Sequence, residues 1–215
     1  MKKILFFSIV LLVLSACATQ TLSTSSQTMK KKKVTTAELL TIRLASIQKK
    51  GYMAGHQDDP FYGINWSYEP NRSDILETTG DYPAVMGFDL GGIEKADSKN
   101  LDSVPFNLIH DEAIRHAERG GIVTFSWHPR NPLTGGTAWD VSSDQVVKSV
   151  LPEGKEYQKF QLWMQRVGDF LCTLKDSKGN PIPIIFRPWH ENNGSWFWWG
   201  QDNCSDADYH ALWNM

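Results

Sequence analysis

The sequence predicts an α/β fold of parallel βα units, a (β/α)₈ or TIM barrel, beginning at residue 34. Short runs rich in Val, Ile and Phe alternate with longer segments of helical periodicity, which is the order that parallel βα units require. Each expected strand also ends in reactive polar residues, as in barrels whose sites lie at the carboxyl ends of their strands. A glycine-rich phosphate fingerprint does not follow the first strand, which weakens the alternative of a doubly wound nucleotide-binding sheet.

The expected elements follow from periodicity, capping residues and breakers. They are a helix over 35–50 capped by Thr35 or Thr36, a weak strand over 51–55, a short helix from Ser73 or Asp74 to Thr79, a strand over 84–88, a helix over 106–118, a strand over 122–127, a helix over 157–175, a strand over 182–186, and a helix that begins at 206–208. The helix over 106–118 should end at Gly120-Gly121, because glycine readily adopts the left-handed backbone found after helices.

Apolar positions support two of these helices. In the helix over 35–50 these positions are 39, 40, 42, 44 and 47. In the helix over 157–175 they are Leu162, Trp163, Val167, Phe170, Leu171 and Leu174. The helix over 35–50 is expected to lead into the domain, and the apolar positions of the helix over 157–175 are expected to form its buried side.

The expected strands are too few to close a barrel. A (β/α)₈ barrel takes about 250 residues, whereas residues 34–215 supply four of its eight strands by this count. We therefore expect residues 34–215 to form a domain truncated to about its first four βα units.

Residues 1–17 have the pattern of an export signal. Lys2 and Lys3 precede an apolar stretch over 4–14 that is too short to span a membrane. The sequence Leu-Ser-Ala-Cys at 14–17 is similar to the cleavage box of bacterial lipoproteins, in which the cysteine becomes the lipidated first residue. We therefore predict a membrane anchor at Cys17, with an ordinary signal cleaved elsewhere as the alternative.

Residues 18–33 are expected to form a flexible tether between the anchor and the domain. The segment is rich in Thr, Ser, Gln and Lys, and it contains little that a core could bury. Its four lysines at 30–33 are expected to be solvated, with anionic head groups or nucleic acid as the alternative contacts. Because no acidic cluster follows Cys17, we expect the protein on the periplasmic side of the outer membrane rather than on the cell surface.

Composition restricts the partners. The chain has 22 Lys and Arg residues against 24 Asp and Glu residues, so nucleic acid is not indicated as a partner. The two cysteines other than Cys17 are Cys172 and Cys204, which we expect at opposite ends of the barrel and therefore unbridged. We expect a monomer that needs no cofactor and no metal.

The segment 184–200 carries the clearest chemical signal. An apolar run at 184–186 leads to Glu191, which is surrounded by four of the nine tryptophans. Pyranose rings present apolar faces that pack on indole, and cleavage of a glycosidic bond needs a carboxylic acid that is neutral at working pH. Burial of Glu191 between rings would favour its neutral form, so the segment predicts a proton donor in an aromatic cleft. A tryptophan-rich core with a salt-bridged glutamate is the alternative, although Asn192-Asn193-Gly194 indicates a loop.

Four blocks occur in order across residues 51–200. They read Gly-His-Gln-Asp-Asp at 55–59, Tyr-Pro-Ala-Val-Met-Gly-Phe-Asp at 82–89, Phe-Ser-Trp-His-Pro at 125–129, and Arg-Pro-Trp-His-Glu-Asn-Asn-Gly-Ser-Trp-Phe-Trp-Trp-Gly at 187–200. The last block closely resembles the acid/base segment of glycoside hydrolase family 26, whose best-populated activity is endo-β-1,4-mannanase. The resemblance implies that residues 34–215 are the first part of a catalytic barrel that hydrolyses β-1,4-mannosidic bonds in mannan or manno-oligosaccharides.

The same resemblance implies site residues and a retaining mechanism with two carboxylates. Glu191 would be the general acid/base, and His190 would lie beside the nucleophile and the sugar. His128 and Trp196 match positions that hold substrate near the scissile bond. The nucleophilic glutamate is implied on a seventh strand that is not among the four expected here, so we expect this chain alone to have little or no hydrolase activity.

Other polar residues at the strand ends have less definite roles. Arg187, Asp89 and His56 would contact the substrate or belong to a polar network in the upper layer of the barrel. Asp58, Asp59 or Asp89 could replace the nucleophile, but we expect the distance and approach angle to be wrong because they follow the first two strands.

Substrate class leaves one alternative within the same family and one outside catalysis. A β-glucanase or xylanase would differ in how the sugar hydroxyl groups are read, and the Trp-Phe-Trp-Trp-Gly run favours mannan. A non-catalytic glycan-binding lipoprotein would instead use Trp139, Trp196, Trp198 and Trp199 as a stacking platform.

A metal-dependent hydrolase is the remaining enzyme alternative. It would place His56, Asp58, His128 and His190 around a divalent ion. These residues do not have the short helical or strand spacing of a known ligand motif, so the sequence favours the metal-free interpretation.

Overall fold

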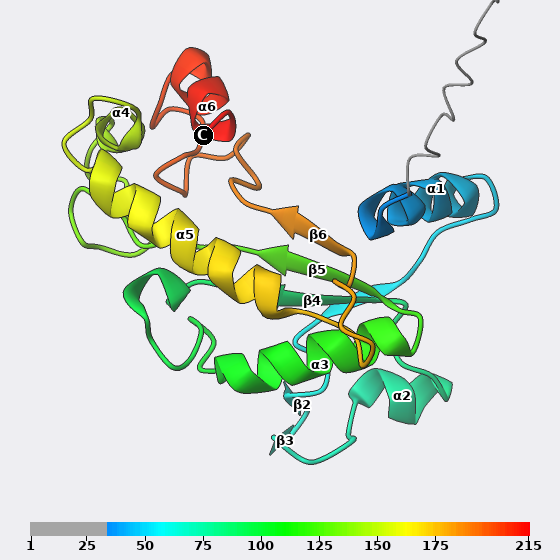
Figure 1. The fold of residues 1–215 in the computed structure, drawn as a ribbon. Helices are drawn as coiled ribbons and strands as arrows, with labels where there is room; N and C mark the ends of the chain where they lie inside the picture. The colour runs from blue at the N-terminus through cyan, green and yellow to red at the C-terminus, as the bar shows by residue number, and fades with distance from the viewer. Residues whose placement is uncertain (1–33) are drawn as a thin grey trace, which may run out of the picture. The chain divides into compact units, whose positions relative to one another are not determined.

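The computed structural model describes residues 34–215 (Figure 1). The predicted signal segment over 1–17, the lipidation at Cys17 and the tether over 18–33 lie outside the described residues. In the range 34–215, every helix is too short or too polar to cross a membrane. The elements in chain order are α1 (Thr36–Gln48), β1 (Gly55–Gln57), β2 (Tyr62–Gly63), β3 (Trp66–Ser67), α2 (Asp74–Thr79), β4 (Val85–Asp89), η1 (Ile93–Lys95), α3 (Phe106–Glu118), β5 (Ile122–Ser126), α4 (Val146–Val150), α5 (Tyr157–Thr173), β6 (Ile184–Arg187) and α6 (Asp206–Trp213).

Four strands form one parallel sheet in the order β1-β4-β5-β6. Val85 of β4 pairs with Gly55 of β1 and with Ile122 of β5, and Val123 of β5 pairs with Ile184 of β6. Helices α3 and α5 connect consecutive strands and lie along the same side of the sheet (Figure 1). This arrangement confirms the predicted parallel βα units, and in the described part of the chain the sheet is open, with β1 and β6 as its outer strands.

The sheet has an apolar face toward the helices and a more polar opposite face. The rings of Phe88 on β4 and Phe125 on β5 lie 5.7 Å apart, and Phe125 meets Phe170 of α5 at 6.1 Å. Because successive side chains alternate between the faces of a strand, Thr124 and Arg187 belong to the opposite face. There Arg187 Nε donates a hydrogen bond of 3.2 Å to Thr124 Oγ1. In a closed barrel this polar face would be the interior.

An aromatic cluster supports the carboxyl ends of β5 and β6. Trp127 stacks on Phe160 of α5 with ring centroids 6.0 Å apart, and it lies 5.3 Å from Trp189. Trp198 and Trp199 pack edge to face at 5.1 Å and are both completely buried. Each large ring buries roughly 150–250 Å², so this cluster is a major source of stability where the loops leave the sheet.

The helical predictions are largely confirmed. The helix predicted over 106–118 has the bounds of α3, and Gly120 after it is left-handed with φ of 87°. Thr35 caps α1 through a reciprocal capping box with Glu38, and Ser73 caps α2. Cys172 and Cys204 are free thiols.

Strand bounds and some loops differ from the predictions. The first strand lies at 55–57 rather than 51–55. The strand predicted from Ile182 begins at Ile184, because the Ile182 N–H bonds Leu174 O and Pro183 has no N–H to donate. The hairpin of β2 and β3, the single turn η1 and the short helix α4 were not predicted from periodicity.

One burial prediction was partly wrong, and α1 buries little. Leu162 was expected on the buried side of α5 but is 51% exposed, and Phe160 occupies the core instead. In α1 only Leu40 is buried, whereas Leu39 and Ile42 are exposed. The apolar positions of α1 are distributed around the helix, so no single face can bury them together in the described part of the chain.

Candidate active site

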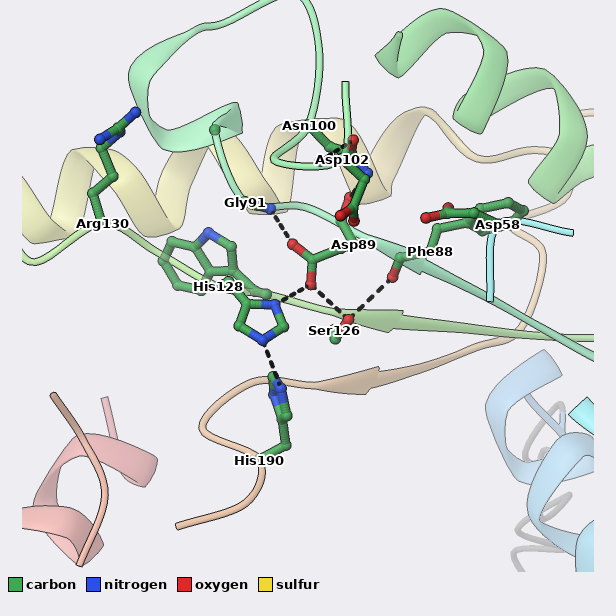
Figure 2. A network of polar contacts seen from close by, with 12 residues as sticks. Asp58, Phe88, Asp89, Gly91, Asn100, Asp102, Ser126, His128, Arg130 and His190 are labelled. Atoms are coloured by element: carbon green, nitrogen blue, oxygen red, sulfur yellow. Dashed lines mark hydrogen bonds and ion pairs between the residues drawn. The ribbon is translucent and has the colours of Figure 1, made fainter. Parts of the chain in front are cut away.

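The reactive residues predicted from the sequence follow the parallel strands. Asp89 is the last residue of β4, His128 lies just after β5, and His190 lies just after β6. Carboxyl ends of parallel strands meet at the same edge of a sheet, and these three side chains point toward one another across that edge (Figure 2).

A continuous chain of polar contacts joins these side chains. Asp89 Oδ1 accepts a hydrogen bond of 2.6 Å from Gly91 N–H, and Asp89 Oδ2 accepts one of 2.6 Å from the Ser126 hydroxyl. His128 Nδ1 lies 2.6 Å from Asp89 Oδ2, and His128 Nε2 lies 3.1 Å from His190 Nε2 (Figure 2). The structure therefore brings Asp89, His128 and His190 together as a carboxylate-imidazole-imidazole relay.

The hydrogen-bond partners in this relay determine which nitrogen carries a proton when both imidazoles are neutral. Burial by itself would raise the pKa of Asp89, but the hydrogen bond and charge of His128, with the Ser126 and Gly91 donors, hold that pKa below its ordinary value. Asp89 is therefore a carboxylate, and His128 Nδ1 donates to it. When His128 is neutral, its Nε2 accepts, so His190 donates from its own Nε2.

In this tautomer His190 Nδ1 carries no proton and is a hydrogen-bond acceptor. The Nδ1 atom is buried and has no hydrogen-bond partner among residues 34–215. Burial is the largest cause that lowers the pKa of His190, so its ring stays neutral near pH 7. An unpaired buried acceptor of this kind suits a hydroxyl or carboxyl group brought by a ligand.

The turn after β6 adopts an uncommon backbone that directs Glu191 away from the core. Trp189 and Glu191 have φ of 51° and 55°, which is left-handed and costs non-glycine residues roughly 1–2 kcal/mol each. Two hydrogen bonds hold the turn. The Tyr209 hydroxyl donates a hydrogen bond of 2.7 Å to Trp189 O, and Trp199 Nε1 donates one of 2.9 Å to His190 O. Local packing thus maintains a strained loop at the candidate site.

Glu191 is not buried as the sequence suggested. Its side chain is exposed in residues 34–215, and Trp196 Nε1 donates a hydrogen bond of 3.0 Å to Glu191 Oε2. The prediction that rings enclose this carboxyl group was therefore wrong for the described part of the chain. The alternative of a core glutamate in a salt bridge is equally inconsistent with its exposure.

Aromatic rings flank the relay, but only some are accessible. Trp139 and Trp196 are each 48% exposed, and the buried Phe197 lies between them at 5.4 Å and 6.3 Å. Trp139 also stacks on the ring of His128 at 5.1 Å with an interplanar angle of 11°. Trp198 and Trp199 are core residues, so the predicted platform of four tryptophans is wrong and only two are available for stacking.

His56 and Arg187 are not joined to the relay by any hydrogen bond or ion pair of the described residues. His56 Nδ1 lies 3.1 Å from Asp59 Oδ1, and Arg187 bonds Thr124. Beside β1, burial and then the charge of Asp102 raise the pKa of Asp58 to about 7.

The described residues do not support the metal-dependent alternative. Within residues 34–215, His, Cys, Asp and Glu side chains do not gather in a group of three or more that could hold an ion. His56, which that alternative required, contacts Asp59 rather than His128 or His190.

Sequence reasoning missed two contributors to the site. Ser126 was not singled out, although its position two residues before His128 on the same strand face is a usable signal. Phe197 was not predicted between the two exposed indoles, and no sequence signal separates it from its buried neighbours Trp198 and Trp199.

Two hollows adjoin the candidate site. One of about 230 Å³ is lined by polar and aromatic residues that include Asn100, His128, Arg130 and Trp139. A larger one of about 580 Å³ lies against α6 and begins at Asn192, next to Glu191. The site thus has space on both the His128 side and the Asn192 side.

Comparison with known proteins identifies similar sequences and structures. The sequence model of glycosyl hydrolase family 26 matches residues 28–215. A mannan endo-1,4-β-mannosidase from Bifidobacterium adolescentis is 39% identical over 152 residues, and one from Bacillus subtilis strain 168 is 30% identical over 138 residues. The solved structure of a family 26 β-mannanase from Bacteroides ovatus has 46% identity and a TM-score of 0.83.

These matches cover most of this chain but only part of its relatives. The alignments take in 69% of this chain and 15% of the Bifidobacterium protein, and 62% of this chain and 36% of the Bacillus protein. The structural match to the Bacteroides β-mannanase covers 85% of this chain and 53% of the Bacteroides chain. The chain therefore spans about half of that solved structure and less of these curated relatives.

Proposed function

This chain belongs to glycoside hydrolase family 26, and on that premise we propose that it supplies the acid/base half of a site that hydrolyses β-1,4-mannosidic bonds. The observation that carries the proposal is the position of Glu191. Its exposed carboxyl group accepts a hydrogen bond from the Trp196 indole, and Glu191 directly follows His190, the last residue of the Asp89-His128-His190 relay. Relatives named as mannan endo-1,4-β-mannosidases support mannan as the substrate class.

Glu191 would act as general acid and then as general base. The Trp196 N–H bond to Oε2 orients the carboxyl group, so Oε1 can face the glycosidic oxygen. In a retaining mechanism the protonated acid first gives its proton to the leaving oxygen, and the carboxylate then deprotonates the water that releases the glycosyl intermediate. Enclosure by bound sugar would replace water around an otherwise exposed acid and favour its neutral form.

The relay would orient the sugar in the cleaving subsite. With Asp89 ionised, the lone pair of His190 Nδ1 is an acceptor that a sugar hydroxyl can satisfy. Because the relay is anchored on three neighbouring strands, the position of this acceptor is held by the sheet rather than by a single loop.

The exposed indoles of Trp139 and Trp196 would stack on sugar rings along the chain of the polysaccharide. Their placement on either side of Phe197 supports binding of more than one ring. A β-glucan or xylan would use the same stacking surfaces, so the preference for mannan depends on hydroxyl recognition and on the relatives named above.

A retaining mechanism also requires a nucleophilic carboxylate about 5–5.5 Å from Glu191. Asp89 already accepts hydrogen bonds from three donors in the relay, so it is a poor candidate for the nucleophile. We propose that the nucleophile comes from a further part of the barrel and that the 215-residue chain alone has little or no hydrolase activity.

The first test compares Glu191→Gln with the unchanged protein in mannohexaose binding and in release of reducing ends from mannan. Glu153→Gln is the matched control, because Glu153 is also exposed and lies in a different loop. In a protein that completes the barrel, we expect Glu191→Gln to lower turnover by roughly 10²–10⁴ while binding persists, since that is the usual contribution of general acid–base catalysis.

Two outcomes would contradict the proposal. Equal turnover in Glu191→Gln and Glu153→Gln would remove Glu191 from the acid/base role. Mannan hydrolysis by the 215-residue chain itself, abolished by Glu191→Gln, would show that a carboxylate within this chain serves as nucleophile.

A further inference from the structure

Glu94 is a buried carboxylate outside the relay. It lies in the turn η1 after β4 and is completely inaccessible to solvent. A buried carboxyl group must be matched by donors, because an unsatisfied one is costly. The identity of its donors therefore indicates its role.

Three N–H groups meet this carboxyl group. Glu94 Oε2 accepts a hydrogen bond of 2.9 Å from Gly92 N–H and one of 3.2 Å from Trp127 Nε1. Glu94 Oε1 accepts one of 3.0 Å from Arg130 N–H. Both oxygens are thus occupied by donors, and two of these donors come from the loop after β5.

Those two donors bracket His128. Trp127 immediately precedes it and Arg130 follows it by two residues, so one side chain from the β4 loop fixes the chain on both sides of the imidazole. On the other side of the loop, Trp198 Nε1 donates a hydrogen bond of 3.1 Å to Pro129 O. The backbone that carries His128 is therefore held between the loops after β4 and β6.

We infer that Glu94 is a positioning residue that sets the orientation of His128, and through it the contact with His190. Asp89 holds the His128 ring at Nδ1, but it cannot fix the backbone from which the ring extends. The Nε2 to Nε2 distance of 3.1 Å tolerates little displacement, because hydrogen bonds weaken rapidly with distance and angle. Glu94 supplies the second anchor that this geometry needs.

The inference rests on the proposed function only in assigning His128 a role in substrate binding. The geometric claim is tested without substrate, on the whole protein, by ¹⁵N NMR of the histidine rings. The readouts are the tautomer and the titration midpoint of His128. Failure of the proposed function would appear as absent mannan binding or turnover, and failure of this inference as unchanged His128 behaviour.

The informative substitution is Glu94→Gln. Its amide keeps one oxygen but turns an NH₂ toward at least one of the three donors, so either the Trp127 and Gly92 side or the Arg130 side loses its acceptor. We expect the titration midpoint of His128 to move and the hydrogen bond between His128 and His190 to weaken. Glu112→Gln is the control, because Glu112 is also buried but pairs with Arg115 of α3 and with Arg119 just after it, away from the loop that carries His128.

The comparison separates positioning from simple stabilisation. Both variants are expected to lower the denaturant midpoint, but only Glu94→Gln should change the tautomer or midpoint of His128. Equal His128 behaviour in the two variants would overturn the inference. If Glu94→Gln does not fold, Trp127→Phe removes the indole donor to Glu94 while an aromatic ring remains in the core, at the cost of some packing against Phe160 and Trp189. A changed His128 midpoint in that variant supports the inference, and an unchanged one refutes it.

Discussion

Replacement of Asp89 by asparagine tests the protonation pattern of the relay most directly. The carboxylate accepts from Gly91 N–H at one oxygen and from Ser126 and His128 at the other. Asparagine has one oxygen and one NH₂, so it cannot satisfy all three donors in this arrangement. His128 can adapt by moving its proton from Nδ1 to Nε2.

That adaptation would propagate to His190. Two Nε2–H groups cannot face each other at 3.1 Å, so His190 would have to move its proton to Nδ1 and accept at Nε2. Asp89→Asn should therefore invert both tautomers. The acceptor that we propose for a sugar hydroxyl would become a donor.

The energetic cost follows from burial and charge. Asp89 is 2% exposed, and hydrogen bonds to buried charged groups contribute about 1.5–3 kcal/mol each. Loss of the charge opposite His128, partly offset by the tautomer change, should lower the free energy of unfolding by about 3 kcal/mol at pH 7. The folded pKa of Asp89 lies below its ordinary value, so this stabilisation is present above about pH 4 and is lost as pH falls through the folded pKa.

The assay combines urea unfolding at pH 7 and pH 3 with ¹⁵N NMR of the imidazoles. Asp111→Asn is the control, because Asp111 also pairs with an imidazole, that of His110 at 2.9 Å, but is well exposed. Exposed pairs contribute about 0–1 kcal/mol. The reasoning is refuted if Asp89→Asn costs no more than Asp111→Asn, if the difference is independent of pH, or if the His128 tautomer is unchanged.

Two further predictions concern the neighbouring carboxyl group and the exposed indoles. The pKa of Asp58 is raised to about 7, so the unchanged protein should lose stability as pH rises from about 4 to about 7. Asp58→Asn should be stabilised relative to the unchanged protein over the same window, as measured by urea unfolding at several pH values. A difference in unfolding free energy that does not change with pH would contradict the burial argument. Trp139→Ala and Trp196→Ala should each weaken mannohexaose binding by roughly 0.5–1.5 kcal/mol in calorimetry, with little effect on unfolding. Trp198→Ala, at a buried position, should instead lower the free energy of unfolding by about 3–5 kcal/mol. If Trp198→Ala weakened binding and left unfolding unchanged, the four-tryptophan platform would be the better interpretation.

The order of elements and the edge that holds the site were accessible from the sequence because local signals encode them. Periodicity and the Gly120-Gly121 pair gave α3 its bounds, and Thr35 marked the start of α1. The apolar run before Arg187 predicted a strand, and parallel strands bring their carboxyl ends together wherever they lie in the chain.

The tertiary structure decided which side chains face solvent and which face one another. Trp196, Trp198 and Trp199 belong to one short loop, yet only Trp196 is exposed, because the path of the loop turns Trp198 and Trp199 inward, where their indole N–H groups donate to Pro129 O and His190 O. Burial of Glu191 was wrongly predicted for the same reason, since residue type and neighbours do not specify the direction of a loop.

The sequence by itself determined the parallel βα order, the strand ends that carry Asp89, His128 and His190, and the identity of Glu191 as the distinctive acid. Only the tertiary structure decided that Asp89, His128 and His190 form one relay and that Glu94 anchors it. Residues 89 and 128 are 39 positions apart, and residues 128 and 190 are 62 apart. Contacts across such separations depend on strand register and loop packing, which act through the whole sheet and leave no local pattern in the chain.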